Sequence, residues 1–150
     1  MWSKIIISLT LVTLSRAGFA PAVTGNITEI QIKTADQLFA GMDYGHLDLI
    51  VCGQSECCLT ERLESGDESF QRGQLDSFIG EDLQRCQNFG LPKNYINDIL
   101  IAHRGIDNWR GEYLFVLLDS GVFYHCDIPD WLTSDGEINL DCSVKKNEDQ

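Results

Sequence analysis

Basic residues are scarce in this sequence, and it has no apolar run long enough to cross a membrane as a helix. Its 150 residues include 11 lysines and arginines against 23 acids, a formal charge of −12. An acidic chain repels the phosphates of nucleic acid, so no nucleic-acid partner is expected. The surplus of carboxylates either supplies oxygen ligands for calcium or simply keeps the protein soluble, and the charge alone does not choose between these roles.

An apolar stretch near the amino terminus predicts secretion. Lys4 precedes the run IIISLTLVTL, about ten residues long, whereas a membrane-spanning helix needs about twenty. Ser15-Arg16-Ala17 follows as a small-x-small cleavage pattern, so residues 1–17 are predicted to be a signal peptide. Removing them takes away two bases and no acid, which leaves 9 bases, 23 acids and a formal charge of −14. We therefore expect a secreted, extracellular protein.

The sequence lacks the Cys-x-x-Cys pairs and paired histidines of structural zinc sites, so zinc is not expected. Six cysteines are present, and an oxidising secretory route predicts three disulfides among them. Cys57 and Cys58 are neighbours, so each should pair elsewhere. Cys52 and Cys57 flank a turn-like stretch and are predicted to close a hairpin, although fifteen pairings are possible in principle. The predicted disulfide residues are Cys52, Cys57, Cys58, Cys86, Cys126 and Cys142.

No repeat, long linker or helix-length apolar pattern follows the predicted signal. Short runs that alternate apolar with polar residues predict β-strands, and glycines beside Asp, Asn or Ser mark the turns between them. The predicted fold class is all-β, a two-sheet antiparallel β-sandwich of about eight strands stabilised by disulfides. The run at 112–118 is apolar on both faces and should lie in the middle of a sheet. Strands are predicted at 29–33, 46–51, 59–63, 96–103, 112–118, 122–128 and 138–142.

The length is enough for one packed core, so a single domain is expected. Residues 18–27 are predicted to form an amino-terminal arm, 28–142 the sandwich, and 143–150 a flexible polar tail. The sequon Asn26-Ile27-Thr28 makes Asn26 a predicted glycosylation site on the arm.

The connection at 65–92 is too long to be bare loop in a compact domain. Phe70 and Phe78 are predicted to pin it by burial, worth about 2 to 3 kcal/mol for each side chain. Arg72 is expected to pair with Asp76 or with nearby backbone carbonyls. A catalytic role for these two residues has no nucleophile or base close by in the sequence, so we interpret the segment as structural.

A set of short motifs runs in a fixed order along most of the chain. The motifs are Ala40-Gly41-x-Asp43, Phe70-x-Arg72-Gly73-x-x-Asp76-x-Phe78, Ile101-x-His103, Asn108-Trp109, Glu112-Tyr113, Tyr124-x-Cys126 and Trp131-Leu132. This ordered set, which covers residues 28–132, resembles the PLAT domain, also called the lipoxygenase homology domain. The resemblance implies an eight-stranded antiparallel sandwich. It also implies a non-catalytic module that binds lipid surfaces or partner proteins, often with calcium in the loops at one end.

The resemblance implies a calcium site in those loops. Asp43 stands at the family's acidic position after Ala-Gly, and Asp107 lies in a later loop that supplies a second carboxylate in calcium-binding members. Asp36 would complete the cage, because calcium accepts six to eight oxygens in irregular geometry. The chain departs from the family pattern at Met42, where Thr is usual, and at Ala35, where Gly is usual. Ordinary turn capping by these aspartates is the alternative.

Two apolar residues, Leu38 and Phe39, lie in the same predicted loop as Asp36 and Asp43. If exposed, they would act as a membrane wedge worth about 3 to 5 kcal/mol. Calcium bridging the aspartates to lipid phosphate would strengthen the attachment. The alternative is that Phe39 folds back onto the rim of the core.

No constellation of nucleophile and base is found, so we expect no enzymatic activity. The stretch at 53–57 lacks the final glycine of a nucleophile elbow, and oxidised cysteines cannot form a Cys-His pair. His103 and His125 fall on strands and could neighbour one another in a sheet. Trp109 and Trp131 are predicted to pack in the core or at its rim, outside any site.

Two functions remain open for what we expect to be a monomer. Leu38 and Phe39 favour a lipid- or membrane-surface module. The disulfides, the sequon and the lack of a basic patch for anionic lipid favour a protein-binding module, such as a secreted effector, a venom component or an extracellular ligand.

Overall fold

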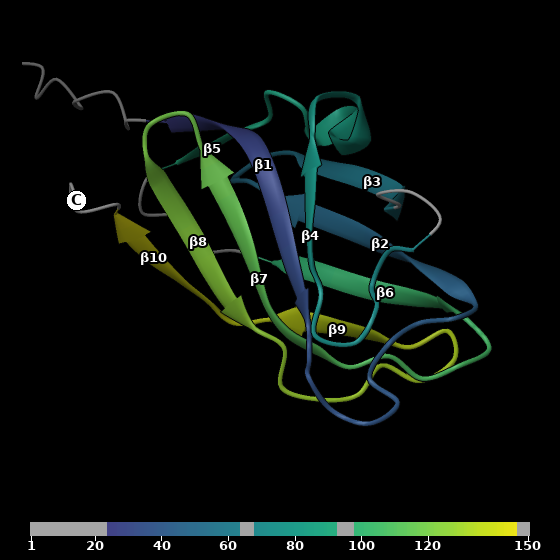
Figure 1. The fold of residues 1–150 in the computed structure, drawn as a ribbon. Helices are drawn as coiled ribbons and strands as arrows, with labels where there is room; N and C mark the ends of the chain where they lie inside the picture. Colours follow the sequence, from purple (N-terminus) through teal and green to yellow (C-terminus); the bar gives the residue numbers. More distant parts are fainter. Residues whose placement is uncertain (1–23, 64–67, 93–97, 147–150) are drawn as a thin grey trace, which may run out of the picture.

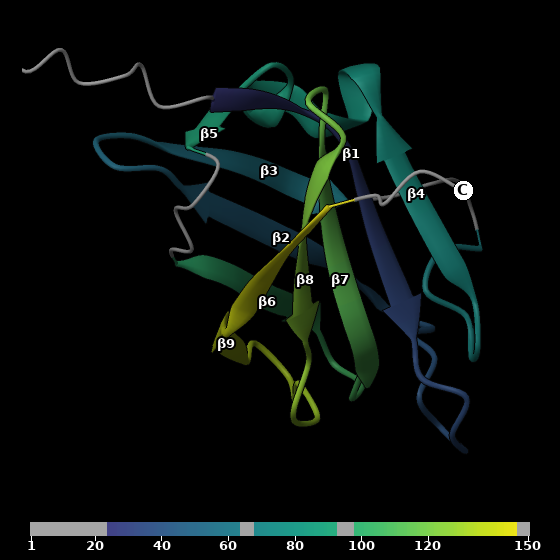
Figure 2. The ribbon, with the colours of Figure 1, turned by 90° about the vertical axis from the view of Figure 1, so that its left-hand side faces the viewer.

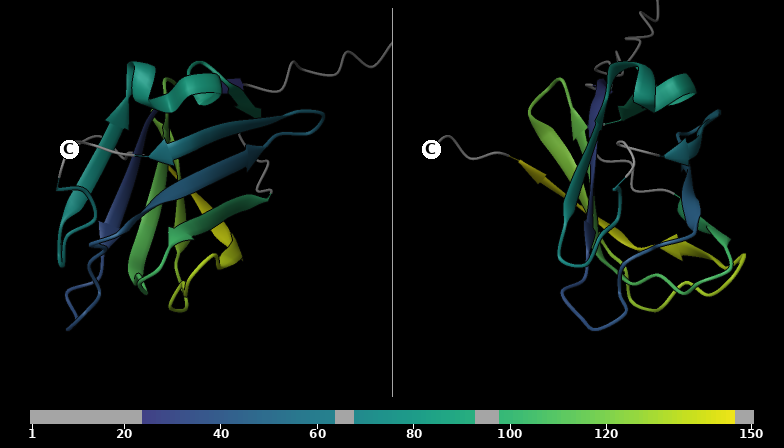
Figure 3. Two further views of the ribbon diagram at one scale, coloured as in Figure 1. Left: turned by 90° about the vertical axis from the view of Figure 1, so that its right-hand side faces the viewer. Right: turned by 45° about the vertical axis from the view of Figure 1, so that its right-hand side comes forward.

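The structure is a computed structural model that describes residues 24–63, 68–92 and 98–146. Two antiparallel sheets face one another and enclose one core, which confirms the predicted β-sandwich (Figure 1). The first sheet has the strand order β10-β8-β7-β1-β4, with β5 also paired to β1, and the second has the order β3-β2-β6-β9. The described residues thus form ten strands, where the sequence pattern predicts about eight. The two layers and the different directions of their strands are clear in the side views of Figures 2 and 3.

The strand bounds agree with the predicted runs to within a few residues in most cases. The first sheet contains β1 (Thr24–Thr34), β4 (Leu75–Ile79), β5 (Gly90–Pro92), β7 (Gly111–Leu118), β8 (Val122–Asp127) and β10 (Cys142–Lys146). The second sheet contains β2 (Gly45–Cys52), β3 (Cys57–Leu63), β6 (Ile99–Gly105) and β9 (Glu137–Leu140). A short 3-10 helix, η1 (Gly80–Cys86), follows β4. No helix in the described part of the chain has the length and apolar character needed to cross a membrane.

The core forms because alternate side chains of each strand point between the sheets. On β2, Leu47 and Leu49 are fully buried while the residues between them are partly exposed. The strand β7 lies between β8 and β1 and contributes Leu114 and Val116 to the same core. The predicted central position of this apolar run is therefore confirmed.

The first and last strands extend further toward the two ends of the chain than the sequence predicts. The predicted arm at 18–27 is already strand from Thr24, because β5 pairs with the start of β1 and places Asn26 opposite Gly90. Asn26 is exposed, and its backbone N–H and side-chain amide both donate hydrogen bonds to the carboxylate of Asp119. The predicted tail at 143–150 begins as strand β10, which pairs with β8 through Lys146. The predicted signal at 1–17 lies outside the described residues.

The long connection at 65–92 contains β4, η1 and β5, and its two phenylalanines are buried as predicted. The rings of Phe70 and Phe78 stack with their centroids 5.8 Å apart. The edge of Phe70 also meets the buried ring of Trp109, at a centroid distance of 6.0 Å. The segment is thus held by aromatic packing in the core.

The predicted pairing of Arg72 with Asp76 is wrong. Asp76 lies on the inward face of β4 and is 2% exposed, so the exposed guanidinium of Arg72 remains outside. Arg72 Nε instead donates to Asp36 Oδ1, 2.8 Å away. The buried Asp76 carboxylate accepts hydrogen bonds from the Phe70 backbone N–H, at 2.9 Å, and from the side-chain amide of Gln74, at 2.8 Å.

All six cysteines form disulfides. The bond between Cys52 and Cys57 closes the β2–β3 hairpin, as predicted. The other two bonds join β3 to η1 and β8 to β10, through the pairs Cys58–Cys86 and Cys126–Cys142.

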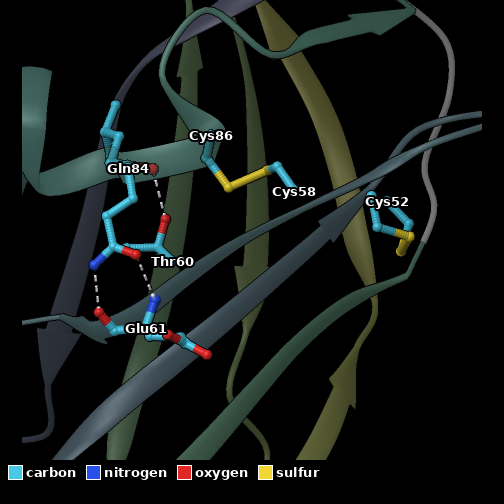
Figure 4. The surroundings of a disulfide bond; sticks show 8 residues. Cys52, Cys58, Thr60, Glu61, Gln84 and Cys86 are labelled. Carbon is cyan, nitrogen blue, oxygen red and sulfur yellow. Dashed lines mark hydrogen bonds between the residues drawn. A yellow bond between two sulfur atoms is a disulfide. The ribbon is translucent and has the colours of Figure 1, made fainter.

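The attachment of η1 also covers the free edge of β3 (Figure 4). The side-chain amide of Gln84 donates to the backbone carbonyl of Glu61 and accepts from its N–H, as a neighbouring strand would. Thr60 donates its hydroxyl hydrogen bond to the carbonyl of Leu83, at 2.8 Å. The two Gln84 contacts occupy backbone groups that an open edge strand would offer to another chain.

Candidate functional site

Four connections gather at one end of the sandwich, along the lower side of Figure 1. They are the β1–β2 connection at 35–44, the segment at 69–74 that leads into β4, the β6–β7 connection at 106–110 and the β8–β9 connection at 128–136. The helix η1 lies at the opposite end in the same view.

Backbone hydrogen bonds hold the β1–β2 connection at both of its sides. The Ala35 N–H donates to the carbonyl of Arg110, and the Arg110 N–H donates to the carbonyl of Ala40, at 2.9 and 3.1 Å. Further on, the Met42 N–H donates to the carbonyl of Phe70. Ala40 and Met42 are both buried, whereas residues 36–39, between the anchored Ala35 and Ala40, are exposed and project outward.

The projecting stretch carries Leu38 and Phe39, which are 67% and 80% exposed. Phe39 has a φ of 65°, in the left-handed region that bulky residues rarely adopt. It does not fold back onto the rim of the core, which was the alternative left open by the sequence. The described residues include seven exposed large hydrophobic side chains, and five of them lie in the connections at this end: Leu38, Phe39, Tyr44, Ile106 and Trp131.

An open hollow of about 540 Å³ lies among these side chains. Its lining is part apolar and part acidic, formed by Leu38, Phe39, Gly41, Asp43, Asp107, Asn108 and Trp131. We call it the end hollow. Gly41 allows the close approach of two connections here, because a side chain at this position would meet the backbone N of Arg72 at 3.0 Å.

The two tryptophans have different places. Trp109 is fully buried, and its indole N–H donates to the hydroxyl of Thr34 at 3.2 Å, which confirms its predicted role in the core. Trp131 is 40% exposed at the rim and lines the end hollow, beside the candidate site from which the sequence analysis left it out.

Asp107 joins the connections to one another. Its Oδ2 atom accepts hydrogen bonds from the backbone N–H groups of Asp43 and Tyr44, at 2.7 and 3.0 Å. Its Oδ1 atom lies 3.4 Å from Nε2 of the fully buried His103. The other ring nitrogen, Nδ1 of His103, lies 3.1 Å from the carbonyl of Thr133 in the β8–β9 connection. This chain of contacts ties three of the four connections together.

The predicted calcium residues do not form one oxygen cage. Asp36 is exposed and ion-paired with Arg72, whereas Asp107 is engaged with backbone N–H groups. Over the ranges that the structure describes, no three His, Cys, Asp or Glu side chains come together in a group that could hold a metal ion. The arrangement of Asp36, Asp43 and Asp107 in this structure therefore does not fit a calcium cage, and Asp107 instead bonds backbone N–H groups of the β1–β2 connection.

His103 and His125 are not neighbours, because β6 and β8 belong to different sheets. His125 instead belongs to a ring cluster on the first sheet that the sequence analysis did not identify. Phe115 is its centre, with ring centroids 4.8 Å from His125 and 5.4 Å from Phe123. The Tyr113 ring centroid lies 4.7 Å from that of Phe115 and 5.8 Å from that of His125. We call these four residues the outer ring cluster, since alternation on β7 and β8 turns them away from the core. The signal was a pair of ring-bearing residues two positions apart on each of these strands.

No family model and no curated protein matches the chain in sequence. Solved structures are similar in fold. The alpha toxin from Clostridium absonum matches with a TM-score of 0.57 at 20% identity, over 83% of this chain and 33% of the toxin chain. A lipoxygenase in complex with arachidonate matches with a TM-score of 0.55 at 17% identity, over 78% of this chain and 16% of that chain. This chain therefore spans a third or less of either protein, and the similarity shows a shared PLAT-like fold.

Proposed function

We propose that this protein is a secreted, non-catalytic module that docks reversibly on lipid surfaces through the end of the sandwich that carries the end hollow. One observation carries the proposal: five of the seven exposed large hydrophobic side chains in the described ranges lie in the connections at this end. Grouped exposed apolar side chains on a folded domain are a common mark of an interaction surface. The PLAT-like fold supports the same function, because the family resemblance implies binding to lipid surfaces. Secretion rests on the predicted signal at 1–17.

Insertion of the projecting stretch would supply the attachment. Immersing Leu38 and Phe39 in the acyl region contributes about 3 to 5 kcal/mol. Trp131 suits the boundary between headgroups and acyl chains, because its ring is apolar and its N–H remains a hydrogen-bond donor. The backbone hydrogen bonds at both sides of the stretch already order it, so little conformational entropy is lost on binding. The proposal requires no calcium.

Co-sedimentation with neutral phosphatidylcholine vesicles tests the proposal. We expect the wild-type protein to sediment with the vesicles, and the double variant Leu38→Ser with Phe39→Ser to partition at least about 100-fold less. The control is Ile79→Ser, which removes an exposed apolar side chain 59% accessible to solvent near η1 and should leave partitioning unchanged. Absence of wild-type binding, or an equal loss in the control, would refute docking through this end.

The outer ring cluster favours a second function, binding to a protein partner. Aromatic side chains are enriched at protein interfaces, and four neighbouring rings on an outward sheet face are an unusual feature for a surface in water. Recovery of one stoichiometric protein from extracellular fluid, lost on Phe115→Ser with Phe123→Ser, together with no vesicle binding, would favour this alternative.

A further inference from the structure

The docking end carries a net negative charge, which would repel a lipid phosphate. Its four connections contain five carboxylates and two guanidinium groups, a formal charge of −3, from Asp36, Asp43, Asp107, Asp130 and Asp135 against Arg72 and Arg110. Of the two cations, Arg72 is already ion-paired with Asp36. The whole chain has a formal charge of −12. Electrostatics therefore disfavours an anionic headgroup at this end and favours a cationic one.

The lining of the end hollow is suited to a cation that also has apolar surface. Phe39 and Trp131 supply two aromatic rings, and the faces of such rings attract cations. Asp43 supplies an exposed carboxylate to the same hollow, and the carboxylate of Asp107, engaged with backbone N–H groups, adds negative charge to its lining. The Asp43 carboxylate is exposed and accepts no hydrogen bond from the described residues, whereas Asp107 Oδ1 is buried and faces Nε2 of His103 at 3.4 Å. Leu38 adds aliphatic contact surface.

We propose that the end hollow binds the quaternary ammonium group of a choline headgroup and so directs docking to phosphatidylcholine. This inference rests on the proposed function and names the lipid that the same site selects. A quaternary ammonium cannot donate hydrogen bonds and loses little hydration when it is buried, and its methyl groups match aromatic walls. The primary ammonium of phosphatidylethanolamine is strongly hydrated and loses more on entering the hollow. A volume of about 540 Å³ lies in the ordinary range of small-ligand sites.

The geometry of a phosphatidylcholine surface agrees with this assignment. The choline group is the outermost part of the headgroup and the phosphate lies deeper, so an approaching acidic surface meets the positive charge first. The projecting Leu38 and Phe39 then enter between headgroups, and the hollow, of which they form one wall, takes up the ammonium. Headgroup recognition and insertion share Phe39, and a substitution that removes the ring but keeps the apolar bulk separates them.

Calorimetric titration with soluble phosphocholine and phosphoethanolamine tests the hollow without a membrane. We expect phosphocholine to bind about tenfold more tightly. Phe39→Leu keeps the apolar bulk and removes the ring, so it should weaken phosphocholine binding about fivefold and change vesicle partitioning by less than about threefold. The ring control is Phe123→Leu in the outer ring cluster. Asp43→Asn should also weaken binding, and Asp82→Asn on η1 is its charge-matched control at the opposite end.

The outcomes separate the two proposals. Equal binding of the two soluble headgroups, or no binding of phosphocholine, overturns the choline assignment, and continued vesicle partitioning would leave docking intact. Selective phosphocholine binding by a protein that fails to partition onto any vesicle supports the assignment of the hollow and refutes docking. Equal effects of Phe39→Leu and Phe123→Leu would also overturn the assignment, because the hollow's own ring would then have no special role.

Discussion

At the residue scale, Asp76 shows how a charged side chain can be part of the core. It lies on β4 between exposed residues, and alternation turns its carboxylate inward beside Phe78. Its two oxygens accept hydrogen bonds from the Phe70 backbone N–H and from the amide of Gln74. Phe70 has a φ of 61°, so these bonds help to hold a backbone conformation that is unfavourable for a bulky residue.

We therefore predict that Asp76→Ala lowers the free energy of unfolding by about 2 to 4 kcal/mol, since it removes two charge-assisted hydrogen bonds and leaves a buried N–H without a partner. Urea denaturation followed by circular dichroism measures the change. Asp82→Ala, at an exposed position on η1, should shift the value by less than about 0.5 kcal/mol. A loss no larger than that of the control would mean that the Asp76 hydrogen bonds do not support the fold.

At the scale of elements, the sequence predicts those strands whose buried face is apolar and whose exposed face is polar. β2 and β7 were found because their buried positions are aliphatic. β4 was missed because its pattern is inverted: Leu75 and Ile79 face outward, and Asp76 faces inward. β10 is mostly polar, and pairing with β8, reinforced by the Cys126–Cys142 bond, explains its extended form.

The candidate site was predictable only in part, for a similar reason. The apolar pair Leu38-Phe39 stands out in a polar loop, so local sequence was sufficient to single it out. The contribution of Trp131 depends on which connections meet in space, and no local pattern contains that information. The expected calcium residues do not come together in this structure, because Asp36 pairs with Arg72 from a segment more than thirty residues away.

The three disulfides should contribute unequally to stability, because they close loops of different length. The Cys58–Cys86 bond joins residues 28 apart, and the Cys52–Cys57 bond joins residues 5 apart. Loop-closure entropy predicts a cost of about 3.5 kcal/mol for replacing the first pair by alanine and about 2 kcal/mol for the second. Parallel urea denaturation of the two double variants measures the difference. A larger loss for the shorter hairpin bond would contradict the entropic account.

At the scale of the whole molecule, two forces of different range act on membrane binding. The apolar side chains at the docking end act only on contact, whereas the formal charge of −12 acts over about 10 Å at 0.1 M salt. Peripheral proteins with basic patches lose affinity for anionic lipid when salt is added. The negative docking end of this protein has the opposite sign, so the opposite salt response is expected.

We predict that raising the salt concentration from 0.01 to 0.5 M strengthens binding to vesicles that contain phosphatidylglycerol, by about tenfold, because screening weakens repulsion. Binding to neutral phosphatidylcholine should change much less. Sedimentation in the presence of a chelator measures both and removes any contribution of divalent cations.

The double variant Asp130→Asn with Asp135→Asn neutralises two exposed carboxylates outside the end hollow. It should raise binding to the phosphatidylglycerol vesicles at low salt and leave phosphocholine affinity unchanged. A fall in binding with added salt would show that a cationic surface contacts the membrane, and the docking end assigned to this fold would then be wrong.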